Sequence, residues 1–202
     1  MKKNTIITLS VIGAVILGLV CIYASFKGSY NKMVALDEEV TAQWAQVQNQ
    51  YQRRMDLIPN LVSTVKGYAA HEASVFTEVA EARSQAGGVV NIDANVLEDE
   101  VAFKRYQQVQ DTLSSSLRRL LSVSENYPEL QANQNFLALQ DQLEGTENRI
   151  STERKRFNDS AREYNVYIRQ FPRSIIANMN GFRTKAYFEA SAQAQSAPVV
   201  QF

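Results

Sequence analysis

The residues of this sequence that could do chemistry are concentrated between positions 53 and 72. The stretch holds arginines, a lysine, carboxylates and the one histidine of the chain, His71. His71 and Glu72 are adjacent, whereas a zinc site on one helix needs ligands at i and i+4. The one cysteine, Cys21, lies inside an apolar run, and there is no glycine-rich phosphate loop. We therefore expect no metal, no cofactor and no catalytic site.

The chemistry that remains in this stretch is charge pairing and hydrogen bonding with a partner. The candidate partner-binding residues are Arg53, Arg54, Asp56, Asn60, Lys66, His71 and Glu72. The alternative is that these groups pair with one another within the fold. Arg53 can reach Asp56 at i+3, and any buried carboxylate would need such a partner, because an unpaired buried carboxylate is costly. Lys plus Arg and Asp plus Glu are both 21. This balance argues against nucleic acid as the partner, since phosphate binding needs excess cation.

A charge-free apolar segment precedes these residues. It runs from Thr5 to Phe26, and as a helix it would rise about 33 Å, enough for a hydrocarbon core of roughly 30 Å. Lysines at positions 2 and 3 favour an N-terminus in the cytoplasm, with the rest of the chain outside. The alternative, a cleaved signal peptide, fits poorly because Ile22 or Tyr23 would stand where a small residue is needed.

Small residues repeat every four positions in this segment, at Ser10, Ala14 and Gly18. Such a face lets membrane-spanning helices approach closely, which predicts self-association of the anchor and a homo-oligomer. Small residues are also common in membrane helices that do not associate, so the alternative stays open.

The elements that must position these residues are helices. Apolar residues recur at intervals of three and four in four runs, within residues 33–51, 61–82, 103–120 and 136–171. This period predicts an all-α fold with coiled-coil-like packing: an N-terminal transmembrane helix followed by an elongated antiparallel four-helix bundle made of two long helical hairpins. The first helix is expected to continue from the anchor. Pro59 is compatible with a new helix or a kink.

The positions of the breaks also predict the register between helices. A first turn near Leu57 would place Trp44 beside His71 and Glu72, and a second turn near Asn126 would pair Leu117 with Phe136. Asn126 and Glu129 have capping-box spacing. The fourth helix would overhang its partner after about residue 155, towards the membrane. Its mixture of basic and aromatic residues suits a headgroup layer, or else the aromatics pack on the first helix.

Several ordered blocks resemble the signature of the LemA family. They are RRMDLIPNLV at 53–62, VKGYA at 65–69, HE at 71–72, SENYPEL at 124–130, AN at 132–133, NF at 135–136, LE at 143–144, TENRI at 146–150, RFN at 156–158, YN at 164–165 and FP at 171–172. Phe157 stands where the family usually has Tyr. The resemblance runs from about residue 30 to 188. It implies a bacterial membrane protein with one N-terminal span, a long antiparallel helical domain and no established catalytic activity.

These observations divide the chain into an anchor (1–27), a LemA-like helical bundle (28–190) and a low-complexity tail (191–202). The last residue, Phe202, suits a PDZ groove, so a PDZ-containing protease or adaptor is a further expected partner. The leading functional hypothesis is a self-assembling scaffold at the bacterial cytoplasmic membrane. The alternative is a monomeric adaptor that presents its helical tip or its tail to a membrane protease or envelope-stress factor.

Overall fold

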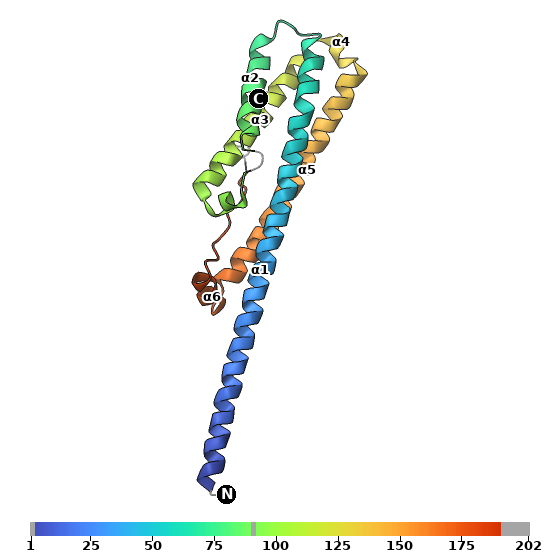
Figure 1. Ribbon diagram of the computed structural model, residues 1–202. Helices are drawn as coiled ribbons and strands as arrows, with labels where there is room; N and C mark the ends of the chain where they lie inside the picture. Colours follow the sequence, from blue (N-terminus) through green and yellow to red (C-terminus); the bar gives the residue numbers. More distant parts are fainter. Residues whose placement is uncertain (1–2, 90–91, 191–202) are drawn as a thin grey trace, which may run out of the picture.

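The computed structural model describes residues 3–89 and 92–190, and all of the regular elements in these ranges are helices. The fold is therefore all-α, as predicted. Figure 1 shows a long N-terminal helix that projects from one end of an elongated bundle. The elements are α1 (Lys3–Lys66), α2 (Ala73–Gly87), the 3-10 helix η1 (Ala94–Glu98), α3 (Glu100–Ser124), α4 (Pro128–Gln131), α5 (Gln134–Arg169) and α6 (Arg173–Met179).

α1 is a single helix of 64 residues that joins the apolar segment to the far tip of the bundle. Pro59 lies inside it without ending it. Proline has no N–H, so the carbonyl four residues earlier loses its helical partner. That carbonyl belongs to Met55, and the Arg83 guanidinium of α2 donates to it at 3.5 Å. The continuity of α1 with the anchor is thus confirmed, and of the two expectations for Pro59 the start of a new helix is wrong.

The most extensive helix packing joins α1 to α5, and the next joins α2 to α3. Nearly all of the apolar residues predicted from the helical period form one core between them, whereas Tyr68 and Phe171 are exposed. Its centre is aromatic: the Trp44 ring lies 5.1 Å from Tyr106 and 5.8 Å from Phe157, centroid to centroid. Phe103 of α3 completes this layer at 5.9 Å from Trp44.

Both predicted registers are wrong. α1 runs on to Lys66, so the first turn comes later than Leu57, and Gln48 of α1 donates to the carbonyl of Ile92 at 2.9 Å. Trp44 therefore lies among Phe103, Tyr106 and Phe157, whereas His71 lies in the turn between α1 and α2.

The second register fails because residues 125–133 form turns and the short α4 between α3 and α5. Ser114 of α3 consequently faces Glu147, at 3.5 Å. The predicted capping box is absent too: Tyr127 is the N-cap of α4 without a side-chain bond, and the Asn133 side chain caps α5 by accepting from Phe136 N–H.

The lower part of α5 runs back along α1 towards the apolar segment, as predicted (Figure 1). Phe157 and Tyr164 are buried there, which fits aromatics packed on the first helix. Phe171, just after α5, is instead 82% exposed. The interpretation that the aromatics pack on the first helix therefore holds for Phe157 and Tyr164 but not for Phe171.

Candidate interaction site

The polar centre of the bundle is built around Arg54. This side chain is only 1% exposed. Its guanidinium lies 2.9 Å from Glu147 of α5 and donates to the Ser114 hydroxyl of α3 at 2.6 Å. It also donates to the side-chain carbonyl of Gln110 at 2.5 Å. A buried charge needs such partners, because its lost hydration is otherwise uncompensated. Arg54 thus connects three helices and is not presented to solvent.

Burial also affects the phenols beside this arginine. The Arg54 guanidinium lies 5.0 Å from the centroid of the Tyr51 ring. Burial raises the pKa of Tyr51 to about 12, and it raises the pKa of Tyr106 as well. Both phenols therefore stay protonated at neutral pH and behave as core side chains, not as proton donors or acceptors.

A second polar site holds the segment after α6. Residues 183–190, here called the strap, run as extended chain back over the bundle between α5 and the region of η1 and α3 (Figure 1). The Lys185 ammonium lies 2.9 Å from Asp37 of α1 and 2.9 Å from Glu98 of η1. Phe188 inserts into the aromatic layer, 4.8 Å from Phe103 and 6.1 Å from Trp44.

The main chain of the strap is bound by three side-chain carboxamides. The amide of Asn165 donates to the Lys185 carbonyl and accepts from its N–H, both at 2.8 Å. Asn158 makes the same two bonds with Phe188, both at 2.9 Å. Gln107 of α3 binds Glu189 in this way at 2.8 and 3.1 Å. Each carboxamide satisfies one backbone donor and one acceptor, so the strap is held without strand pairing.

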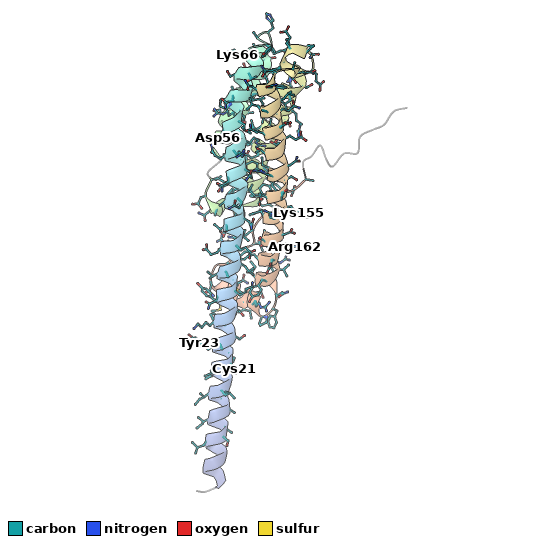
Figure 2. The ribbon with its side chains drawn as sticks, turned by 90° about the vertical axis from the view of Figure 1, so that its right-hand side faces the viewer. Cys21, Tyr23, Asp56, Lys66, Lys155 and Arg162 are labelled. Atoms are coloured by element: carbon teal, nitrogen blue, oxygen red, sulfur yellow. The ribbon has the colours of Figure 1, made fainter. Side chains whose placement is uncertain are left out.

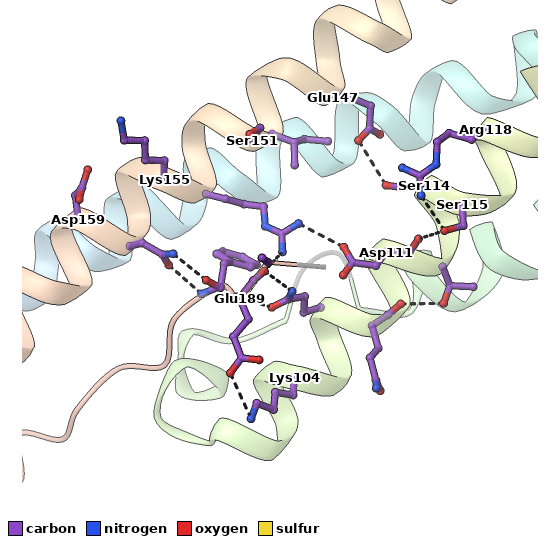
Figure 3. Close-up of a pocket in the computed structure, with 18 residues that line it drawn as sticks. Lys104, Asp111, Ser114, Ser115, Arg118, Glu147, Ser151, Lys155, Asp159 and Glu189 are labelled. Carbon is purple, nitrogen blue, oxygen red and sulfur yellow. Dashed lines mark hydrogen bonds and ion pairs between the residues drawn. The ribbon is translucent and has the colours of Figure 1, made fainter. Parts of the chain in front are cut away.

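An open polar groove lies between α3 and α5 beside the end of the strap. Its volume is about 1070 Å³, and it is shown in Figure 3. Cationic and anionic side chains line it together: Lys104, Arg118, Arg154 and Lys155 with Asp111, Glu147, Asp159 and Glu189. Several are already paired, as Arg154 is with Asp111 at 3.4 Å. The described residues contain no group of three or more His, Cys, Asp or Glu that could hold a metal.

The predicted partner-binding residues lie in three different settings. Arg53, Asp56 and Asn60 are exposed on one side of α1, and Asp56 is labelled there in Figure 2. Lys66 and His71 are exposed at the tip, and Glu72 beside them is half-buried. Arg54 is in the core. Phe202 and the rest of the tail lie outside the described residues.

In the predicted anchor face, Ser10, Ala14 and Gly18 are all exposed on α1. Nothing lies within 4 Å of the position where a Cβ would stand on Gly18. Within the described chain, one helix is long and apolar enough to cross a membrane, and this segment belongs to it. The face is open to a second helix in the geometry that the small-residue spacing predicts.

The sequence profile of the LemA family matches residues 43–202. The chain belongs to the LemA family. It is also similar to Magnetosome protein MamQ of Magnetospirillum gryphiswaldense, with 28% identity over 188 residues, 86% of this chain and 69% of the relative. Magnetosome proteins MamQ 1 and MamQ 2 of Paramagnetospirillum magneticum are 27% identical over 189 residues, 86% of this chain and 70% of each relative.

The part of the chain matched to the LemA family includes the strap and all three carboxamides that bind it. Sequence reasoning did not single these residues out as a site. Two of the LemA-like blocks carried a signal for them, because these blocks contain Asn158 and Asn165, which lie on the inward side of α5. An inward-facing Asn in the middle of a helix, repeated after seven residues, indicates a bound backbone, because Asn otherwise disfavours helix interiors.

Proposed function

We propose that this LemA-family chain is a non-enzymatic, self-assembling scaffold at the bacterial cytoplasmic membrane. Its N-terminus would lie in the cytoplasm and its helical domain outside. The observation that carries the proposal is the continuity of α1, which runs as one helix from the apolar segment to the tip. When two anchors associate, a continuous helix also sets the spacing and direction of the two domains, so contacts in the membrane would order the whole array.

The names of the relatives agree with a structural role. The relatives are named as magnetosome proteins. A protein of this kind acts by holding a position on a membrane, which needs an anchor and a stable body but no reactive group.

The domain itself offers little apolar surface for assembly along α1. Met33, Leu36 and Val40 are buried within the same copy, and Val34 beside them is 37% exposed. The anchor therefore becomes the main candidate surface. Its side chains Val11 and Val15 are exposed and suit lipid, and the row of Ser10, Ala14 and Gly18 suits another helix.

The test is the mass of the detergent-solubilised full-length protein, measured by light scattering. The wild type should give a discrete oligomer, and Ala14→Leu with Gly18→Leu should reduce it towards the monomer. Gly13→Leu is the control, because it adds the same side chain as Gly18→Leu but on another side of the helix, where nothing lies within 4 Å of an added Cβ. A wild-type monomer, or an oligomer that both variants leave intact, would refute assembly through this face.

The adaptor remains the second candidate because the tip offers exposed polar groups. Lys66 and His71 are exposed there, and Arg53, Asp56 and Asn60 continue the exposed surface along α1. An adaptor would use this surface, or Phe202 in a PDZ groove, to engage a protease. Charge reversal at Arg53 tests this use of the surface, since Arg53 is exposed whereas Arg54 is in the core. Unchanged recovery of partners by Arg53→Glu would count against this surface along α1.

A further inference from the structure

The short helix α6 lies at the level where α1 leaves its apolar segment. The ring of Tyr30 on α1 is 5.7 Å from the ring of Phe182, which follows α6. Tyr30 is four residues, or about 6 Å, beyond the last residue of that segment, Phe26. Each polar layer of a bilayer is about 5–8 Å thick. With the anchor in a membrane, the end of α6 is therefore within the headgroup layer.

The orientation of the bundle agrees with this level. Figure 2 shows the lower end of the helical domain beside α1, coming down nearly to where Tyr23 is labelled. An ion pair of 3.9 Å between Lys32 and Glu163 holds the lower part of α5 against α1 just above. The fold thus fixes how far α6 stands from the membrane surface.

The side chains that α6 and its preceding turn present outward are apolar. Phe171 is 82% exposed, Met179 73% and Ile175 52%. Ile175 and Met179 are four residues apart and so share one side of the helix, while Ala177 is buried against the bundle. Large exposed apolar side chains gathered at one end of a domain mark a contact surface.

The charge around these side chains is positive. Residues 164–183 contain three arginines, Arg169, Arg173 and Arg183, and no Asp or Glu. Arg169 and Arg183 are exposed, and the Arg173 guanidinium lies 4.2 Å from the centroid of the Tyr167 ring. Aromatic and basic residues side by side are the composition that binds an anionic headgroup layer.

We propose that Phe171, Ile175 and Met179, with these three arginines, form a second membrane contact. We call this set the foot. The foot binds the anionic headgroup layer of the membrane that holds the anchor of the same molecule. Its apolar side chains enter the boundary of the acyl region, and its guanidinium groups bind lipid phosphates. Because the anchor keeps the foot at the surface, even weak binding is sufficient. This contact does not depend on self-assembly.

The test uses the full-length chain in nanodiscs that contain anionic lipid. In a Cys21→Ser background, Met179→Cys carries an environment-sensitive fluorophore. Leu137→Cys is the control, because Leu137 is also exposed but lies near the start of α5, at the opposite end of the bundle. The probe at position 179 should show blue-shifted emission that is quenched by nitroxide groups on the lipids. The probe at position 137 should show neither effect.

The alternative outcomes overturn the proposal. Emission at position 179 that is as red as at position 137 would mean that the foot stands in water. Blue-shifted emission without lipid quenching would mean that a second copy covers α6. Changing Arg169, Arg173 and Arg183 to Gln should remove the dependence on anionic lipid while the helical content stays the same. If quenching in anionic discs is equal before and after this change, the arginines have no part in the contact.

Discussion

The ammonium of Lys185 lies 2.9 Å from the Glu98 carboxylate, although 87 residues separate the two in sequence. Asp37 of α1 is at the same distance on another side. Burial alone would lower the pKa of Lys185, but hydrogen bonds to Asp37 and Glu98 outweigh it, and the pKa is raised above 10.5. The Lys185 ammonium therefore joins the strap to α1 and η1, and its positive charge stabilises the folded state.

This relationship predicts that the protein loses stability in alkali. A group whose pKa is raised in the folded state stabilises the protein fully at pH values below its pKa in the unfolded chain. This contribution is lost as the pH rises through the pKa of the group in the folded state. The pKa of Lys185 is raised from 10.5, and burial raises the pKa of Tyr51 from 10.0 to about 12, so both act in this direction. The free energy of unfolding should fall between pH 10 and pH 12. Urea unfolding at a series of pH values measures it. A flat profile in that window would contradict the prediction, and Tyr51→Phe should make the fall less steep.

Phe188 should be the apolar residue that holds the strap in place. Removing a buried Phe side chain costs about 3–5 kcal/mol, so Phe188→Ala should lower the free energy of unfolding by that amount. Trp44 is the one tryptophan of the chain and packs on Phe188, so its emission should shift to the red in the native state. Tyr187→Ala is the control, because Tyr187 is 42% exposed. Equal effects of the two changes would show that the strap is not anchored in the core.

The Arg54–Glu147 pair should contribute far more than a surface pair of similar length. Glu147→Gln leaves a buried guanidinium without its counter-charge, which should cost about 1–3 kcal/mol. The matched control is Glu78→Gln, which breaks the 2.7 Å pair with Arg119 on the surface and should cost less than about 1 kcal/mol. Thermal unfolding of both variants measures the difference. If Glu78→Gln lowered the thermal stability more than Glu147→Gln, the importance of burial would be refuted.

Two glycines should respond to alanine in opposite directions. Gly181 has a φ of +78°, in the left-handed region, so Gly181→Ala should destabilise by about 1–2 kcal/mol. Gly145 lies inside α5 with nothing within 4 Å of an added Cβ, so Gly145→Ala should stabilise by about 0.5–1 kcal/mol. Denaturant midpoints of the two variants should move to opposite sides of the wild type. A shift in the same direction would contradict one of the two arguments.

The helical period predicted the fold because nearly every buried apolar residue follows it. It also contained a signal for Arg54: Met33, Val40, Val47, Arg54 and Leu61 are spaced by seven. This spacing places Arg54 on the buried stripe, whereas Arg53 lies about 100° away on the helix. Two adjacent arginines thus have different roles, and the phase of the helix distinguishes them.

The register and the strap could not be predicted in this way. Whether Pro59 ends the helix depends on whether another group binds the Met55 carbonyl, and that group, Arg83, comes from a different helix. The strap has no helical period, because its main chain is bound by side chains far away in sequence. Such contacts are decided by tertiary structure, and local pattern carries little information about them.

The unbroken course of α1 has a mechanical consequence. About 60 Å of helix separate Phe26 from Lys66 at 1.5 Å per residue, and the structure has no hinge between them. Membrane helices tilt to match the thickness of the bilayer. A change in tilt of roughly 10° would swing Lys66 sideways by about 10 Å, given that lever length. The anchor and the tip thus move as one rigid lever, so that a change of tilt in the membrane would displace the tip sideways.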